Sequence, residues 1–281
     1  MKNKRAVVLW TGGKDCNLAL HEARKSGYKI IALVTFAMGN ARFRAHPIHV
    51  MKQQARAIGI EHVVISVNEP YEESYEKAIA EIKGKYNIQT IITGDIAEVH
   101  GNTNWITERS KPSDINVFLP LWHLEREKIL QKIFTLKFKV IFSCVKEPWF
   151  TSGWLGRELN SEVLTELHSI HQQKGLDICG EQGEYHTLVL DSPEYYAELS
   201  LDSFIEKKEE DIMYLEIENT SLRKKGGRKK TCPRCQTLFP CLTENCWCSK
   251  LPQIMPLSTD EDCLCPDCLK IEIQNKIEAA I

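Results

Sequence analysis

The sequence predicts an α/β protein built on a parallel sheet and followed by a small cysteine-rich tail. Short apolar runs alternate with segments of helical spacing over the first two thirds of the chain, as in βαβ units. A glycine-rich turn joins the first apolar run to the first helical segment. Eight of the eleven cysteines lie between residues 232 and 268. The composition, 43% hydrophobic and 26% charged over 281 residues, is that of an ordinary globular protein.

The predicted elements follow one another in that alternating order. The strands expected from apolar runs are residues 6–10, 28–36, 62–67, 88–96 and 139–145, with a last strand ending at Asp191. The helices expected from apolar spacing are the segment after the glycine turn and residues 50–58, 75–86, 125–134 and 158–174. Gly59 stands where a left-handed C-cap would end the second helix. Residues 38–49 and 100–118 are expected to be loops.

Charge and hydropathy exclude several classes of protein. The formal net charge of -2 gives no global argument for nucleic-acid binding. No stretch approaches the roughly 20 apolar residues of a membrane span, and the first residues lack the apolar core of a signal peptide. We therefore expect a cytoplasmic protein that does not bind membranes. The basic segment 222–230 is expected to be a linker, and any contact with nucleic acid would be made there.

The glycine turn carries the strongest signal for chemistry. It reads Thr11-Gly12-Gly13-Lys14-Asp15-Cys16. The glycines let the backbone approach an anion, and the helix start offers N–H groups with a partial charge of about half an electron. Lys14 adds a formal charge, and Asp15 is a suitable Mg²⁺ ligand. The spacing excludes a Walker loop and the dinucleotide fingerprint.

A known loop has this arrangement of glycines, lysine and aspartate. The turn resembles S-G-G-x-D-S, the pyrophosphatase loop of enzymes that split ATP between the α- and β-phosphates. Thr11 and Cys16 stand where that pattern has serines, so the hydroxyl is kept at the first position and lost at the second. The alternative is an ordinary glycine turn between a strand and a helix.

A second pair of residues, Gly94-Asp95, ends the fourth predicted strand. In parallel sheets the ligand sits beyond the carboxyl ends of the strands. The glycine turn and this pair both lie at such ends. We therefore expect residues 11–16, Gly94 and Asp95 to border one bound nucleotide.

A third polar cluster precedes the last predicted strand. Glu181, Glu184 and His186 stand within six positions, in a turn rich in glycine and acids. Titratable groups gathered at a strand edge suit a polar site. The alternative is a hairpin loop whose acids are simply solvated.

The cysteine-rich tail indicates a metal site. Two C-x-x-C knuckles, Cys232 with Cys235 and Cys265 with Cys268, enclose four further cysteines: Cys241, Cys246, Cys248 and Cys263. Four thiolates form one closed structural Zn²⁺ site, so eight could form two. A segment this short cannot bury a core, so the metal would supply its folding free energy. Redox or iron–sulfur chemistry is the alternative.

Taken together, these pieces resemble a known family. From residue 6 to the vicinity of residue 200 the chain is similar to diphthine–ammonia ligases, a branch of the pyrophosphatase-loop enzymes. The matching pieces are Thr-Gly-Gly-Lys-Asp at 11–15, Gly-Asp-Ile at 94–96, Pro-Leu-Trp at 120–122 and Gly-Glu-x-Gly-Glu-Tyr-His-Thr at 180–187. The tail resembles a small module named for its Cys-Trp-Cys, here at 246–248.

The resemblance implies a fold and a division of the chain. The fold is adenine-nucleotide α-hydrolase-like (HUP, Rossmann-like), with a smaller α/β substrate subdomain and a zinc-type tail. The expected parts are an ATP-binding domain at 1–120, an acceptor subdomain at 121–221, the linker at 222–230, the zinc-type module at 231–270 and a C-terminal tail at 271–281.

The resemblance also implies a reaction. ATP adenylates a substrate carboxylate and releases pyrophosphate, and ammonia then displaces AMP to leave an amide. Lys14 would neutralise the leaving pyrophosphate, and Asp15 would coordinate Mg²⁺. Glu181, Glu184 and His186 would face the acceptor and ammonia.

The acceptor and two other classes of function stay open at this point. If the source is bacterial, a carboxylate other than diphthine could be the acceptor, on a small molecule or on a protein side chain. A tRNA-modifying thiolase uses the same ATP loop and would need a catalytic cysteine such as Cys144 or Cys179. A non-catalytic sensor would bind ATP and leave it unchanged. The sequence is also compatible with a homo-oligomer.

Overall fold

The computed structural model describes residues 4–39, 42–98, 103–225, 227–242, 248, 251–252 and 263–278. The chain forms two compact units, one of residues 1–195 with 199–222 and the other of residues 196–198 with 223–281. Within the described ranges, no helix is both long enough and apolar enough to cross a bilayer.

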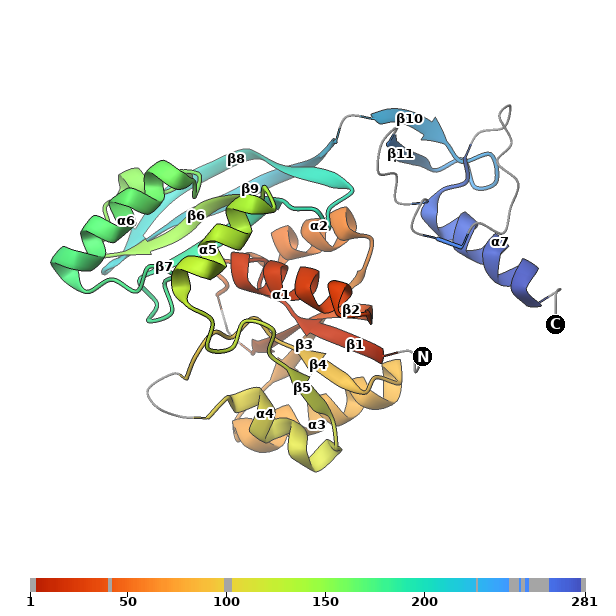
Figure 1. The fold of residues 1–281 in the computed structure, drawn as a ribbon, viewed down its shortest axis with the longest axis horizontal. Helices are drawn as coiled ribbons and strands as arrows, with labels where there is room; N and C mark the ends of the chain where they lie inside the picture. The colour runs from red at the N-terminus through yellow and green to blue at the C-terminus, as the bar shows by residue number, and fades with distance from the viewer. Residues whose placement is uncertain are drawn as a thin grey trace. The chain divides into compact units, whose positions relative to one another are not determined.

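Five parallel strands form the sheet on which the first unit is built (Figure 1). In sheet order they are β3 (Glu61–Val67), β2 (Tyr28–Met38), β1 (Lys4–Leu9), β4 (Thr90–Ile92) and β5 (Asn116–Phe118). The central strand β1 pairs in parallel with β2 on one side and with β4 on the other. The predicted parallel α/β class is therefore confirmed.

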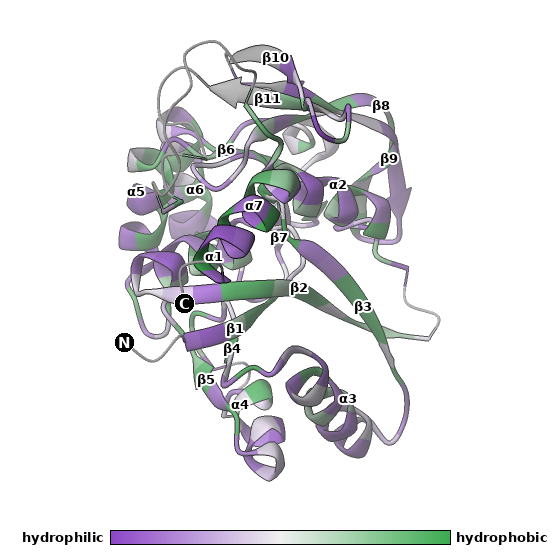
Figure 2. Cartoon of the chain, turned by 90° about the vertical axis from the view of Figure 1, so that its right-hand side faces the viewer, coloured by the Kyte–Doolittle hydropathy of each residue, from purple (hydrophilic) through white to green (hydrophobic). Residues whose placement is uncertain are grey.

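Helices cover both faces of this sheet. Along β1, Ala6 and Val8 face one side and Val7 faces the other, as the pleat requires. The first side packs against α1 (Lys14–Lys25), α2 (Ile48–Ile58) and α5 (Arg126–Thr135), and the second against α3 (Tyr71–Tyr86) and α4 (Trp105–Ser110). Figure 2 shows β2 hydrophobic over most of its length, whereas β3 begins with hydrophilic residues and is hydrophobic further along. Burial on both faces explains why the central strand β1 carries an uninterrupted apolar run, and the edge strand β3 is only partly buried.

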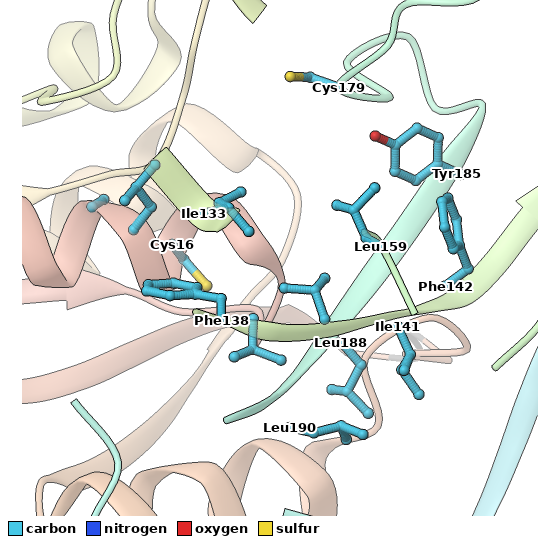
Figure 3. Packing of buried hydrophobic residues seen from close by; sticks show 14 of the residues in the cluster. Cys16, Ile133, Phe138, Ile141, Phe142, Leu159, Cys179, Tyr185, Leu188 and Leu190 are labelled. Carbon is cyan, nitrogen blue, oxygen red and sulfur yellow. The ribbon is translucent and has the colours of Figure 1, made fainter. Parts of the chain in front are cut away.

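A second sheet of four strands lies in the same unit. Its order is β7 (Tyr185–Asp191), β6 (Lys139–Lys146), β9 (Ile212–Lys224) and β8 (Ala197–Glu209), and β6 pairs antiparallel with both β7 and β9. The single turn η2 (Ser152–Trp154) and helix α6 (Ser161–Lys174) connect β6 to β7. Phe142 of β6 packs on Tyr185 of β7 with ring centroids 4.9 Å apart (Figure 3).

Two regions differ from the elements that the sequence predicts. Residues 100–118, expected to be a loop, contain α4, the single turn η1 (Lys111–Ser113) and β5. These elements are too short for a periodic pattern, and α4 depends on a local cap in which Asn104 accepts the amide of Thr107. The long β8–β9 hairpin was not predicted either. The mostly exposed β8 lacks a continuous apolar run, whereas β9 begins with a largely buried apolar run, residues 212–215, that sequence reasoning missed.

The second unit contains the strands β10 (Gly227–Thr231) and β11 (Leu238–Leu242) and the helix α7 (Pro266–Glu278). The two strands pair antiparallel. The segment 222–230, expected to be a linker, holds the end of β9 and most of β10, and α7 crosses the boundary expected at residue 270. The buried cluster of this unit consists of Cys232, Phe239, Cys265 and Cys268.

Candidate active site

The glycine turn lies between the end of β1 and the start of α1. Gly12 has a φ of +83°, and a Cβ atom there would lie 2.1 Å from Oε1 of Gln54. Gly13 is the N-cap of α1, and a Cβ atom there would meet Cε1 of His46 and the carbonyl oxygen of Thr187 at 3.3 Å. The backbone thus makes a tight turn on a helix N-terminus, which is the geometry that binds anions.

Buried polar groups from α2 and β7 hold this turn in place. The Gln54 amide Nε2 donates to the carbonyl oxygens of Gly12 at 2.9 Å and Val189 at 2.8 Å. The backbone N–H of Lys14 donates to Oγ1 of Thr187 at 3.1 Å. Gln54 and Thr187 are almost fully buried. Sequence reasoning missed these two residues as parts of the site.

Lys14 is the buried cation of the site and is only 2% exposed. Its ammonium donates to Oδ2 of Asp15 at 2.8 Å and to the carbonyl oxygen of Cys179 at 2.6 Å. It also lies 5.5 Å from the centroid of the Tyr185 ring. Burial is the largest single influence and lowers the pKa of Lys14, but Asp15 together with Tyr185, Cys179 and Glu181 outweighs it, so the pKa lies well above its usual value. Lys14 therefore stays protonated at neutral pH.

Asp15 has one oxygen engaged and one without a protein partner. Burial raises the pKa of Asp15, and the Lys14 ammonium acts in the opposite direction. Oδ2 accepts from Lys14, whereas Oδ1 is buried and has no hydrogen-bond partner among the described residues. A buried carboxylate oxygen without a partner is costly unless a ligand or cation satisfies it. This atom therefore fits a role as a metal ligand.

Gly94 places the end of β4 directly on the first turn of α1. A Cβ atom at Gly94 would lie 2.6 Å from the carbonyl carbon of Asp15 and 2.7 Å from the backbone nitrogen of Cys16. Glycine is thus required for this close backbone contact. The carboxylate of Asp95 accepts from the side-chain amide of Asn104, the N-cap of α4. Of the predicted pair, Gly94 contacts the glycine turn, whereas Asp95 forms a hydrogen bond with the N-cap residue of α4.

The two glutamates of the third cluster have different surroundings. Glu184 is 1% exposed, and its oxygens accept the backbone amides of Asp177 and Gln182, both at 2.9 Å. Glu184 therefore fixes the loop that precedes β7. Glu181 is half-buried, and burial together with the Asp15 carboxylate raises its pKa to about 7. Glu181 is the group of this cluster that changes charge near neutral pH.

His186 faces a second imidazole, that of His46. The two rings meet edge to face with centroids 5.4 Å apart. Desolvation by the surrounding protein and the charge of Lys14 lower the pKa of His186. Residues 42–47 precede α2, and sequence reasoning assigned no role to His46. Its neighbourhood of Gly13 and His186 places it at the site.

Thr11 and Cys16, the two ends of the glycine turn, have different surroundings: Thr11 is exposed and Cys16 is buried. Cys16 is buried among apolar side chains of the core, and burial raises the pKa of its thiol (Figure 3). Its Sγ lies 3.2 Å from the carbonyl oxygen of Gly13 and 3.6 Å from Oγ1 of the exposed Thr11. The sulfur thus packs behind the turn, where a serine hydroxyl would have the same partners.

The two thiols considered as the catalytic cysteine of a thiolase, Cys144 and Cys179, are buried and protonated. Burial raises the pKa of Cys144 to about 11 and that of Cys179 to about 12. The thiolate is the nucleophilic form of cysteine, so neither side chain is activated at neutral pH.

A cavity of about 470 Å³ lies beside the loop before β7, whose Cys179 carbonyl accepts a hydrogen bond from Lys14. Arg126, Asp177 and Ile178 are among its lining residues, and the guanidinium of Arg126 pairs with Asp177 at 3.1 Å. The carbonyl that accepts from Lys14 belongs to Cys179, the residue next to Ile178. The residue that accepts the Lys14 hydrogen bond is thus the sequence neighbour of a residue that lines the cavity.

Family models match both halves of the first unit. The model of the diphthamide synthase N-terminal domain matches residues 4–110, and that of the C-terminal domain matches residues 125–222. Together the two models span most of the chain. The chain belongs to the diphthamide synthase family. The glycine turn and Gly94 fall in the N-terminal match, and Glu181, Glu184 and His186 fall in the C-terminal match.

A curated relative and a solved structure resemble this diphthamide synthase family member. The diphthine–ammonia ligase of Schizosaccharomyces pombe is 26% identical over 133 residues, which are 47% of this chain and 22% of that protein. The chain thus matches less than a quarter of that relative's length. A predicted subunit of tRNA methyltransferase from Methanocaldococcus jannaschii has a TM-score of 0.40 and 16% identity, covering 67% of this chain and 97% of that chain.

The cysteine cluster lies beyond both diphthamide synthase matches. The sulfurs of Cys232, Cys235, Cys265 and Cys268 all lie within 4.8 Å of one another. A tetrahedral Zn²⁺ with bonds of about 2.3 Å separates its sulfurs by about 3.8 Å, so the four thiols fit a metal ion. The structure thus brings the two predicted knuckles together.

The structure does not place the other four cysteines of the tail in a metal cluster among the described residues. Cys248 and Cys263 are described and are not members of this cluster. The side chain of Cys241 and the whole of Cys246 lie outside the described residues.

Proposed function

We propose that the protein is an ATP-dependent, amide-forming ligase that adenylates a carboxylate and then transfers ammonia to it. Membership of the diphthamide synthase family and the name of the curated relative support this reaction class. The observation that carries the proposal is the Lys14–Asp15 pair on the glycine turn, with one buried carboxylate oxygen left for a ligand. ATP and ammonia are the other substrates.

In the first step, the acceptor carboxylate attacks the α-phosphorus of ATP, and pyrophosphate leaves. The Gly12–Gly13 turn and the start of α1 bind the phosphates. Lys14 stabilises the negative charge that develops on the leaving pyrophosphate. Asp15 would hold Mg²⁺ through Oδ1, and the ion would neutralise phosphate charge when bound.

In the second step, ammonia attacks the carbonyl carbon of the acyl adenylate, and AMP leaves. The nitrogen loses one proton as the amide forms. Glu181, with a pKa of about 7, is suited to accept that proton. Glu184 holds the loop that carries Glu181, and His186 faces the reacting groups.

The acceptor is a carboxylate on a small molecule or a protein side chain, and diphthine is the candidate that the relative's name suggests. Residues 1–120 bind ATP in this proposal, and residues 121–221 bind the acceptor. The cavity beside Arg126 and Asp177 is the place where the acceptor would enter. Neither a thiolase nor an ATP sensor is proposed, since Cys144 and Cys179 are protonated and the site has a group suited to proton transfer.

The proposed role of the cysteine-rich tail is structural. Cys232, Cys235, Cys265 and Cys268 hold one Zn²⁺, which supplies folding free energy to a unit whose buried cluster, among the described residues, consists of Phe239 and three of these cysteines. Such a set of reduced thiolates is stable in the cytoplasm, where we place the protein.

Transfer of oxygen from the acceptor to AMP tests the adenylation step. The protein is incubated with ATP, Mg²⁺, ammonium and candidate acceptors whose carboxylates carry ¹⁸O. If the carboxylate attacks the α-phosphorus, one ¹⁸O atom appears in AMP, as mass spectrometry would detect. AMP that forms without label while the amide appears would contradict the proposal.

A further inference from the structure

His46 lies against the glycine turn and has a polar atom with no partner. Its Cε1 is the atom that a Cβ at Gly13 would meet at 3.3 Å. Nδ1 is bonded to Cε1, so it lies next to the atom that faces Gly13. This nitrogen is buried and has no hydrogen-bond partner among the described residues. Leaving a buried polar group unpaired is unfavourable, so such an atom at a binding site points to a ligand.

The second sheet fixes the segment that carries His46. The His46 ring meets that of His186, on β7, edge to face. Arg44, two residues earlier, pairs with Glu209 on β8 and lies over the ring of Tyr214 on β9, with its guanidinium carbon 6.0 Å from the centroid. These contacts hold the imidazole at the turn.

The imidazole of His46 is neutral at pH 7. Burial, the neighbouring His186 and the Lys14 ammonium lower the pKa of His46 to about 3. A neutral imidazole offers one N–H donor and one lone pair. It can therefore donate a hydrogen bond beside Lys14 without adding a second buried positive charge.

We propose that His46 binds the nucleotide by donating a hydrogen bond from Nδ1 to a phosphate oxygen seated on the Gly12–Gly13 turn. The inference rests on the proposed function, because it takes ATP as the occupant of the turn. Phosphate oxygens are acceptors only, and the turn, the start of α1 and Lys14 already favour an anion at this place. His46 is thus a further binding residue, contributed by the segment before α2.

Nucleotide binding by histidine variants tests the inference. The probe is α,β-methylene-ATP with Mg²⁺, which binds without turnover, and the dissociation constant is measured by titration calorimetry. H46F keeps an aromatic ring against His186 and removes the donor, so binding should weaken about 10- to 100-fold, the loss expected for a hydrogen bond to a charged group. H49F changes an exposed histidine on the first turn of α2 and should bind like the wild type.

Two polar variants separate the hydrogen bond from a packing effect. The side-chain amide of Asn reaches about as far as Nδ1, and that of Gln reaches about as far as Nε2. H46N should therefore retain more affinity than H46Q, and this comparison decides the matter if H46F does not fold. Wild-type affinity in H46F would overturn the inference, as would equal losses in H46N and H46Q with unchanged melting temperatures. Because binding is measured without turnover, failure of the proposed reaction is read separately, from the products of ATP.

Discussion

At the scale of single residues, the first turn of α1 combines a lysine that is charged at neutral pH with a carboxylate that has a protein partner on one oxygen only. The buried Lys14 ammonium keeps its proton because nearby groups raise its pKa, and Asp15, 2.8 Å away, contributes most among them. In return, the lysine offsets part of the cost of burying the carboxylate. The remaining oxygen, Oδ1, is free to bind a cation together with phosphate oxygens. The pair therefore prepares the site for an anion and a metal ion at once.

Replacing Asp15 tests the part of this pair that the chemistry needs. D15N keeps the size of the side chain and removes its charge. We expect AMP formation to fall by about 100-fold or more, because the metal ligand and the partner of Lys14 are both lost. Rates are measured by chromatography of nucleotides, with the melting temperature as a control for folding. A variant that is folded and retains wild-type activity would remove Asp15 from the mechanism.

Glu181 gives the reaction a dependence on pH. With its pKa raised to about 7, its carboxyl is largely protonated below pH 7 and ionised above it. Only the ionised form accepts a proton, so the rate should rise as pH increases through 7. The profile is measured with the concentration of free ammonia held constant, since ammonium also titrates. E181Q should lower the rate and abolish this step, and a step that persists in E181Q would assign it to another group.

Cys16 is expected to be a replaceable packing residue. In C16S the hydroxyl keeps Gly13 and Thr11 as partners, so turnover should stay within about threefold of the wild type. Steady-state rates and the melting temperature of the variant provide the check. A loss of several orders of magnitude in a folded protein would instead indicate that the thiol takes part in the reaction.

At the scale of elements, the contact between β4 and α1 sets the position of the helix start. A side chain at Gly94 would lie 2.6–2.8 Å from backbone atoms of Asp15 and Cys16. Neither backbone can yield without moving the glycine turn. This contact therefore fixes the segment after β4 against the segment after β1, at the place where the nucleotide is proposed to bind.

The variant G94A tests this contact. We expect it to destabilise the fold by about 1–3 kcal/mol and to reduce AMP formation more than stability alone would explain. Denaturant unfolding and activity are measured on the same preparation. The matched control is G84A in α3, where a Cβ would meet nothing within 4 Å and alanine should raise helix stability. If G94A is as stable and active as G84A, the contact does not position the helix.

The sequence predicts those parts of the site whose chemistry is local. The glycine turn, Gly94-Asp95 and the two C-x-x-C knuckles are short motifs in which neighbouring residues supply the geometry. Gln54 and Thr187 could not be predicted in this way, because they act on Gly12 and Lys14 from 42 and 173 positions away. His46 is also distant from Gly13 in sequence, and only the folded chain brings its ring to the turn.

The fold shows the same limit. The central strands could be predicted because burial on both faces makes them apolar without interruption. The three-residue β5 and the mostly exposed β8 have no such signal, since an edge strand and a half-exposed strand tolerate polar residues. The strands predicted at residues 6–10, 28–36, 62–67 and 88–96 correspond to β1 to β4, whereas α4, β5 and the hairpin were recognised only from the structure.

At the scale of the whole molecule, the described candidate active-site residues all belong to the first unit, whereas the cysteine cluster belongs to the second. In our account the metal stabilises only the second unit. C232S should therefore lower the zinc content by one ion per chain, as measured by atomic emission, and should leave AMP formation within about threefold of the wild type. C144A, which changes a buried thiol of β6, is the control and should keep all of the zinc. Zinc content that is the same in C232S and the wild type would refute the assignment.

The fate of ATP tests the central claim most directly. Wild-type protein is incubated with ATP, Mg²⁺, ammonium and a panel of carboxylate acceptors, and AMP, ADP, pyrophosphate and phosphate are quantified. An acyl-adenylate mechanism predicts AMP and pyrophosphate in equal amounts, with AMP release that depends on ammonium and on one acceptor. The same mechanism predicts AMP formation at least about 100-fold slower in D15N. ADP and phosphate as the products would contradict the account, because they would place the cleavage between the β- and γ-phosphates.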